Sequence, residues 1–294
     1  MAARGLIMKS GLAALLTTTA VAFAVAPALA HTPYVVPTTF APERDYVGVS
    51  GGMAEEGFFI PDFAIRGSGD WVVTGSDGVA KPATPTTLKS VTVLDAPLPA
   101  EGTYRIGTGE RPGRAGKQAK IDGVWRAVRP APAPGAAAPQ RRMDEDAPAG
   151  ANGPIDADKV PAGAETVDVQ GYLVAETYVT RGAPTPVKVS GKGFEIEPIT
   201  HPNEIFLSDG FVFRALVDGK PVAGQHVSIY RGGETYESRR TALEATTAAD
   251  GKATVKFEKP GVYVIETRYP GQAAPGATPA TKTWIYTLSF EVTD

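Results

Sequence analysis

The stretch FVFRALVDGKPVAGQHVSIY, residues 211–230, decides the fold class of this chain. Its first seven residues form an apolar run that ends at Asp218-Gly219, a dipeptide that favours a tight hairpin turn. The segment after the turn alternates, which places Val227 and Ile229 on one face of a strand and His226 on the other. The stretch therefore predicts two antiparallel strands that pair with each other and bury one face.

Further strand and turn signals continue to the C-terminus. Turns are expected at Asp250-Gly251 and Pro260-Gly261, each followed by a β-branched or aromatic run. The last two predicted strands are residues 262–269 and 283–292, with a Pro/Gly loop between them. Residues 187–294 are therefore expected to form one small antiparallel β-sandwich.

The N-terminal half has the same all-β character. The chain contains 33 Gly and 26 Pro, and its apolar runs are short, with few stripes of helical period. Six short strands are expected between residues 31 and 128, a spacing typical of an immunoglobulin-like sandwich. The glycine-containing segment 107–113 lacks the strand-to-helix context of a phosphate-binding loop and is expected to be an ordinary loop.

Residues 129–163 interrupt this pattern with repeated Pro, Ala and Gly. Such a composition does not offset the entropy of ordering, so we expect a disordered insertion, with a docking segment for a partner as the alternative. Residues 164–186 then form connecting structure, either a strand pair or a strand followed by a helical turn. They could return to close the first sandwich.

Residues 1–30 have the features of a cleaved export signal. A basic start, an apolar stretch and Ala28-Leu29-Ala30 predict cleavage before His31. The apolar stretch is too short to span a bilayer, and no later segment reaches the roughly 20 apolar residues that a membrane helix needs. The chain has no cysteine, so it lacks the acylated cysteine of a lipoprotein as well as disulfides. We therefore expect a free periplasmic protein.

The composition excludes several kinds of partner and site. A net charge of −3, from 29 basic and 32 acidic residues, does not provide the positive field that nucleic acid requires. Without cysteine there is no thiolate metal site or thiol nucleophile. After cleavage only Met53 and Met143 remain, so a methionine-rich copper(I) site is excluded too. A metal would have to be held by histidine, carboxylate, backbone or the amino terminus.

Three C-terminal motifs, DGKPVAGQHVSIYRGG, TTAADGKATVKF and KPGVYVIETRY, resemble the prealbumin-like and Cna-B-like modules of bacterial envelope proteins. Together with Glu195–Asn203 (EIEPITHPN) and a mature start of His-x-x-Tyr, the chain is similar to the NikM-like periplasmic family associated with cobalt and nickel uptake. The resemblance covers residues 187–294 best, residues 31–66 less well, and the Pro-rich insertion not at all. It implies an all-β protein of two immunoglobulin-like or prealbumin-like β-sandwiches joined across that insertion.

Three histidines are the candidate metal ligands. A cleaved His31 offers its α-amine and its imidazole as a bidentate chelate, although His31 is incidental if the cleavage site alone places it there. His201, in a loop before Pro202, would complete the site, or instead hold that loop by hydrogen bonds together with Asn203. His226 is a weaker candidate, because an outward polar position on a strand explains it. Imidazole suits Ni, Co, Cu and Zn alike.

No constellation indicates an enzyme. The chain has no G-x-S-x-G motif, and its three histidines form no recognisable triad with a nucleophile and an acid. The adjacent carboxylates Glu55-Glu56 and Asp144-Glu145-Asp146 are expected to be solvated charge rather than glycosidase acids or calcium ligands.

The sequence thus favours a periplasmic accessory protein that binds a divalent transition metal, nickel or cobalt by resemblance, and supports its uptake by an envelope transporter. The alternative is a non-enzymatic interaction module that docks on an outer-membrane receptor or a transporter without metal, for example by adding an edge strand to a partner sheet.

Overall fold

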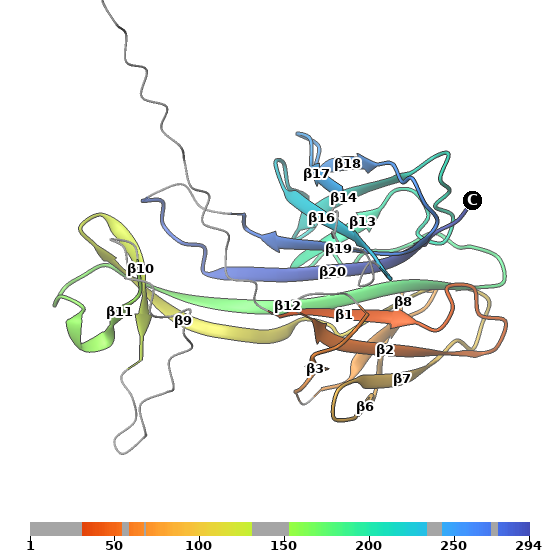
Figure 1. Ribbon diagram of the computed structural model, residues 1–294, viewed down its shortest axis with the longest axis horizontal. Helices are drawn as coiled ribbons and strands as arrows, with labels where there is room; N and C mark the ends of the chain where they lie inside the picture. Colours follow the sequence, from red (N-terminus) through yellow and green to blue (C-terminus); the bar gives the residue numbers. More distant parts are fainter. Residues whose placement is uncertain (1–30, 55–58, 68, 131–152, 234–242, 272–275) are drawn as a thin grey trace, which may run out of the picture. The chain divides into compact units, whose positions relative to one another are not determined.

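A computed structural model describes residues 31–54, 59–67, 69–130, 153–233, 243–271 and 276–294 (Figure 1). The predicted signal, residues 1–30, and the adjacent carboxylates at 55–56 and 144–146 lie outside the described residues. Among the described residues, no helix has the length and apolar character needed to cross a membrane. The described part is all-β, apart from the short 3₁₀ helix η2 (Ala157–Lys159).

The strands form three sheets. The first, here called the N-terminal sheet, has the order β1-β2-β7-β6, with β3 also paired to β2. Its strands are β1 (Thr32–Pro37), β2 (Tyr46–Ala54), β3 (Phe63–Ala64), β6 (Thr86–Thr87) and β7 (Thr92–Pro97). The C-terminal sheet has the order β13-β14-β15, with β18 also paired to β14. Its strands are β13 (Phe194–Pro198), β14 (Phe211–Val217), β15 (Lys220–Pro221) and β18 (Lys252–Val255).

The central sheet is the largest and has the order β11-β10-β9-β12-β20-β19-β16-β17, with β8, β4 and β5 continuing from β12. Its N-terminal members are β4 (Trp71–Thr74), β5 (Ala80–Ala83), β8 (Gly102–Gly107), β9 (Arg111–Ile121), β10 (Val124–Arg129) and β11 (Ile155–Asp156). The others are β12 (Thr166–Arg181), β16 (His226–Arg231), β17 (Leu243–Thr246), β19 (Gly261–Tyr269) and β20 (Lys282–Val292).

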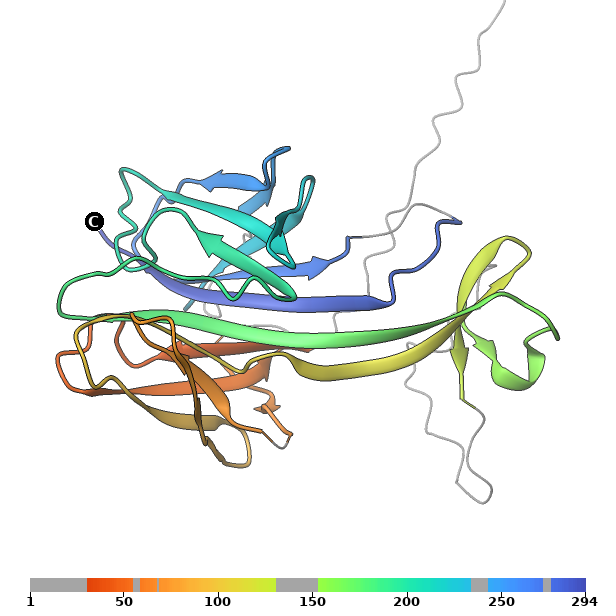
Figure 2. The ribbon, with the colours of Figure 1, turned by 180° about the vertical axis from the view of Figure 1, so that it is seen from behind.

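Strand β12 serves both sandwiches. On one side it pairs antiparallel with β9 and then β8, and on the other it pairs in parallel with β20 (Figure 2). Because successive side chains of a strand point to opposite faces, Val174 and Tyr178 enter one core while Ala175 and Val179 enter the other. The connecting segment expected over 164–186 is therefore a single 16-residue strand that belongs to two cores.

The two cores lie on opposite faces of the central sheet. One forms against the N-terminal sheet and contains Trp71, Ile106 and Val35. The other forms against the C-terminal sheet and contains Phe211, Phe213 and Tyr286. Strand β1 of the N-terminal sheet contacts β12 and β20, and the Thr287 hydroxyl donates to the Pro33 carbonyl at 2.8 Å.

The strand phase predicted after residue 222 is confirmed, because Val227 and Ile229 are both 0% exposed. The predicted pairing of that strand is wrong. After the turn at Asp218-Gly219, β14 pairs with only the two residues of β15, and β16 pairs instead with β17 and β19 in the central sheet. Strand β18 occupies the same edge of β14 over residues 211–214, so no room remains there for β16.

The region after residue 107 differs from the expected loop. Residues 111–121 form β9, which β12 and β10 flank. Its Gly, Ala and Arg content gives little strand signal, and it is held by pairing to its neighbours. Of the Pro-rich insertion, residues 131–152 lie outside the described residues, whereas β11 and η2 are regular structure in the segment expected to be disordered. Ile155 in β11 is buried, and β11 pairs in parallel with β10.

Candidate functional site

The first candidate site surrounds His31, directly before β1. The His31 ring packs on the Phe63 ring with centroids 4.6 Å apart, and His31 Nε2 lies 3.6 Å from the Asp62 Oδ2 carboxylate oxygen. That separation is longer than an ordinary hydrogen bond. Three quarters of the His31 side chain is buried, whereas Asp62 is half exposed. We call these three residues the His31 corner.

The segment that supplies Asp62 and Phe63 packs closely on β2 and β1. A Cβ at Gly52 would lie 3.3 Å from the Tyr34 hydroxyl and would collide with Pro61, so only glycine allows this approach. Phe59 contacts the Tyr34 ring edge-on at 5.6 Å and lies against Gly232 of the turn after β16. These contacts fix the position of the Asp62 carboxylate relative to the histidine.

Polar groups next to the His31 corner tie β1 to the central sheet. The Thr32 hydroxyl donates to Glu266 Oε1 at 2.9 Å, and Arg268 contacts both groups. Burial, followed by the nearby Asp62 charge, raises the pKa of Tyr34. Tyr34 therefore stays neutral at physiological pH, and the Asp62 carboxylate lies 3.6 Å from His31 Nε2.

His201 is held by hydrogen bonds on both ring nitrogens. Nδ1 accepts from the Asn203 amide at 3.3 Å, which leaves the proton on Nε2, where it donates to the Thr185 carbonyl at 3.1 Å. The Thr103 hydroxyl lies 2.9 Å from the same nitrogen and also contacts Thr180. The ring joins the loop after β13 to β8 and to the segment that follows β12, as in the loop-holding alternative for this residue.

His226 lies on the outward face of β16 and is 63% exposed. Its Nε2 is 2.8 Å from Glu244 Oε2 on β17, and the Ser228 hydroxyl donates to that same oxygen. Ser228 stands opposite Glu266 in the strand pairing. His226 and Glu244 therefore lie on the same face of the central sheet as Glu266, which contacts Thr32.

The structure does not gather the three histidines. Among the described residues, no group of three or more His, Cys, Asp or Glu side chains is placed to hold a metal ion. His31 directly precedes β1. The loop of His201 lies near the other end of β1, because Asn203 in that loop contacts the carbonyl of Phe40, which follows β1. The six residues of β1 alone span roughly 20 Å at the rise of an extended strand.

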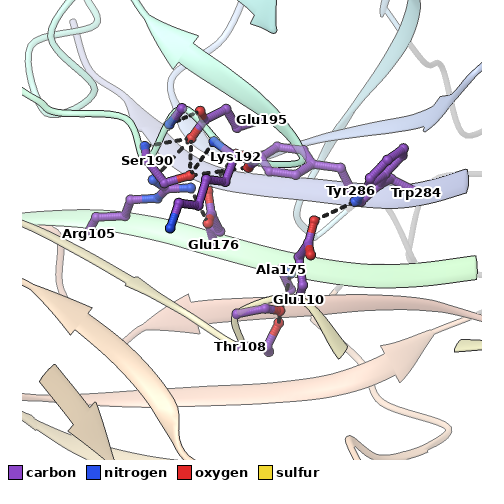
Figure 3. Close-up of polar contacts among 12 residues, drawn as sticks. Arg105, Thr108, Glu110, Ala175, Glu176, Ser190, Lys192, Glu195, Trp284 and Tyr286 are labelled. Atoms are coloured by element: carbon purple, nitrogen blue, oxygen red, sulfur yellow. Dashed lines mark hydrogen bonds and ion pairs between the residues drawn. The ribbon is translucent and has the colours of Figure 1, made fainter. Parts of the chain in front are cut away.

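A buried ionic network is the feature that sequence reasoning missed (Figure 3). The Arg105 guanidinium of β8 donates to Glu176 Oε1 of β12 at 2.5 Å and to Glu195 Oε2 of β13 at 3.3 Å. The Tyr286 hydroxyl donates to the other Glu176 oxygen at 2.7 Å. Glu195 also accepts from the amides of Ser190 and Gly191.

Arg105 stays charged in this setting. Burial would lower its pKa, but the adjacent Glu176 carboxylate holds that pKa well above the ordinary value. Every oxygen of the two carboxylates has a donor, which is the condition under which buried charges are tolerated. The network therefore joins β8, β12 and β13. It presents a saturated set of hydrogen bonds rather than a reactive group.

A second polar contact joins the same region. Trp284 Nε1 of β20 donates to Glu110 Oε1, in the short connection between β8 and β9, at 2.7 Å (Figure 3). Residue 193 must be glycine for two reasons. A Cβ there would collide with the Glu110 carboxylate, and its φ of 64° lies in the left-handed region that favours glycine. The motif around Glu195–Asn203 marked this region by resemblance, but nothing in it identified Arg105 or Glu110 as the partners.

Comparison with known protein families adds one finding. Residues 28–271 match a family model described as a domain of unknown function, DUF4198. The chain belongs to this family. The search of curated proteins returned no match.

Among solved structures, this DUF4198 chain is similar to a tetra-tandem repeat from the extending region of a large adhesion protein, with 10% identity and a TM-score of 0.25. That match covers 90% of the chain and 49% of the other, so the chain spans about half the length of that structure. The D0-D1 domain of intimin matches at 11% identity and a TM-score of 0.21. This match covers 88% of the chain described here and 97% of the intimin chain. A DUF4785 family protein from Legionella pneumophila matches at 10% identity and a TM-score of 0.23. This match covers 80% of the chain described here and 51% of the Legionella chain.

Proposed function

We propose that this DUF4198 protein, exported to the periplasm and cleaved before His31, binds a divalent transition metal as cargo and supports its uptake by an envelope transporter. The metal is bound without turnover. Nickel or cobalt is favoured by the resemblance of the chain to the NikM-like family. The donors are the His31 α-amine and the His31 imidazole.

The contact between His31 Nε2 and Asp62 carries the proposal. A chelate through the amine and ring of one histidine uses Nδ1, the ring nitrogen nearer the backbone, and leaves Nε2 on the far side of the ring. A carboxylate facing that second nitrogen is the usual partner of a metal-bound histidine, because it fixes the tautomer and the ring orientation. Asp62 has this position.

The remaining coordination positions suit a cargo rather than a resident metal. His201 is not included in the proposed centre, because both of its ring nitrogens are hydrogen-bonded, and His226 is paired with Glu244. A two-nitrogen chelate leaves the other positions of a Ni or Co ion to water or to ligands of a receiving protein. Such a site can release its ion by ligand exchange.

The test is calorimetric titration of Ni(II), Co(II), Cu(II) and Zn(II) into protein processed at His31, beside a form that carries one extra residue before His31. We expect tight binding that the extension abolishes. Asp62→Asn should weaken binding by about 10- to 100-fold, the range found for lost outer partners of metal ligands. His226→Gln is the matched control and should bind like the unaltered protein.

Two results would contradict the proposal. Equal affinity of the extended and the processed forms would show that the amine is not a ligand. Absence of binding by either form would leave the metal-free alternative, an interaction module that docks on a receptor or transporter, as the account to pursue.

A further inference from the structure

A groove crosses the outer face of the N-terminal sheet, the face turned away from the core. It has a cavity volume of about 430 Å³ and is lined chiefly by Thr38, Gly48, Ser50, Thr86, Val93 and Asp95. Strands β2, β7 and β6, which provide most of these residues, lie side by side in Figure 1. We call it the β2–β7 groove.

Part of the groove floor carries no side chain, because residue 48 is glycine. Gly48 stands opposite Asp95 in the strand pairing, and Ser50 stands opposite Val93. A Cβ on Gly48 would lie 3.2 Å from the Thr38 methyl and 3.9 Å from Asp95 Oδ1. Any side chain larger than that of alanine would therefore fill the space between Thr38 and Asp95.

Four polar groups of the groove have no partner within the part of the chain that the structure describes. These are the hydroxyls of Thr38, Ser50 and Thr86 and the carboxylate of Asp95. Each hydroxyl can both donate and accept a hydrogen bond, and the carboxylate can accept several. Their convergence on one hollow provides donors and acceptors to a polar ligand without requiring a protein group to be displaced.

An exposed aromatic ring extends the same face. Tyr46 precedes Gly48 by two residues on β2, so it shares that face and lies roughly 7 Å farther along the strand. Tyr46 is 44% exposed, and the Arg44 guanidinium lies near its ring, with Nη1 donating to the Tyr46 hydroxyl at 2.8 Å. Val93 adds an apolar surface inside the groove.

We propose that the β2–β7 groove binds a neutral saccharide of one or two sugar units. Hydroxyls and one carboxylate match the donors and acceptors of a sugar, while Val93 and the Tyr46 ring match its C–H faces. Asp95 is the one charged side chain in the described lining, and the nearby Arg44 guanidinium lies outside that lining and is engaged with Tyr46. The volume lies within the usual range for small-molecule pockets.

The experiment titrates maltose, cellobiose and N,N′-diacetylchitobiose into the full processed chain, with affinity followed by calorimetry and by NMR shifts. At least one should bind, and Gly48→Val should weaken that binding about tenfold or more by filling the floor. Asp95→Asn keeps the shape and should weaken it several-fold. Thr86→Val and Thr87→Val form a matched pair of exposed neighbours on β6, and only the Thr86 change should reduce affinity.

Circular dichroism of each variant checks that it is folded. If Gly48→Val fails to fold, Asp95→Asn and the Thr86→Val and Thr87→Val pair test saccharide binding in its place. Failure of all three disaccharides to bind at millimolar concentration would overturn the proposal, as would binding that Thr86→Val and Asp95→Asn leave unchanged. Binding of the diamine putrescine without any disaccharide would assign the groove to a cation and overturn it too. The groove does not include His31, so metal titration of these variants should be unaffected.

Discussion

At the scale of single residues, two buried tyrosines are in opposite situations, one within the buried ionic network and one near it. The Tyr286 hydroxyl donates to the Glu176 carboxylate, whereas the Tyr178 hydroxyl is buried without a hydrogen-bond partner in the described part of the chain. Tyr286→Phe should lower the free energy of unfolding by about 1.5–3 kcal/mol, the worth of a hydrogen bond to a charged group. Tyr178→Phe should change it by less than about 0.5 kcal/mol or raise it. Urea unfolding of both variants checks this, and equal losses would contradict it.

The same tyrosines predict how stability responds to alkaline pH. Burial raises the pKa of Tyr178 and of Tyr286 above the ordinary value near 10. The folded protein therefore keeps both phenols neutral where the unfolded chain ionises them. The contribution of these neutral phenols to the free energy of unfolding is fully present below about pH 10. It is lost as pH rises further, by about 1.4 kcal/mol per tyrosine for each pH unit.

Absorbance at 295 nm, which reports phenolate, measures this effect. The part of the rise that comes from Tyr178 and Tyr286 should coincide with alkaline unfolding, which circular dichroism follows. Complete titration of all ten tyrosines while the protein is still folded would contradict the prediction.

At the scale of elements, β16 allows a test of strand phase with adjacent residues. Val227→Asp places an unpaired carboxylate in the core and should cost about 4 kcal/mol or more, enough to unfold a protein of ordinary stability. Ser228→Asp is the control, because that side chain points outward, although Glu244 and Glu266 nearby give it a small repulsive cost. Thermal unfolding compares the two, and a folded Val227→Asp variant would show that the phase is wrong.

The prediction of the fold from sequence succeeded where local pattern decides structure. Alternation identified Val227 and Ile229 as core residues, and the Asp218-Gly219 turn is present, with positive φ at both residues. The partner of β16 could not be predicted, because alternation fixes which face a strand buries but not which edge it pairs with. Strand β9 was missed because its Gly, Ala and basic residues have low strand propensity, and its pairing with β12 involves residues about fifty positions away.

The candidate site was predicted only in part. His31 was found because the predicted cleavage before it singles it out, whereas no local pattern distinguishes Asp62 from the other carboxylates. The network of Arg105, Glu176 and Glu195 depends on three strands meeting, and charged residues within strands are ordinarily solvent-exposed, so no local pattern reveals it.

At the scale of the described molecule, β12 predicts that the two sandwiches unfold together. Ala175 and Val179 lie in one core and Val174 and Tyr178 in the other, so neither core can lose the strand alone. Calorimetry should show one transition whose calorimetric and van't Hoff enthalpies agree.

Two tryptophans provide local probes of this cooperativity. Trp71 lies in the N-terminal core and Trp284 in the C-terminal core. With the other tryptophans replaced by phenylalanine, fluorescence of Trp71 alone and of Trp284 alone should give the same unfolding midpoint in urea. Midpoints that differ clearly would show that the sandwiches unfold independently.

The shared strand also sets the order in which the chain can fold as it is made. The N-terminal core requires Ala175 and Val179, so residues up to about 107 must wait for a strand that emerges some seventy residues later. The parallel edge of β12 then waits for β20, since Ala175 pairs with Thr287. Contacts so distant in sequence form slowly. The nascent chain therefore exposes the apolar face of the N-terminal core until β12 is made and that of the C-terminal core until β20 is made, and a holding chaperone would act during that interval.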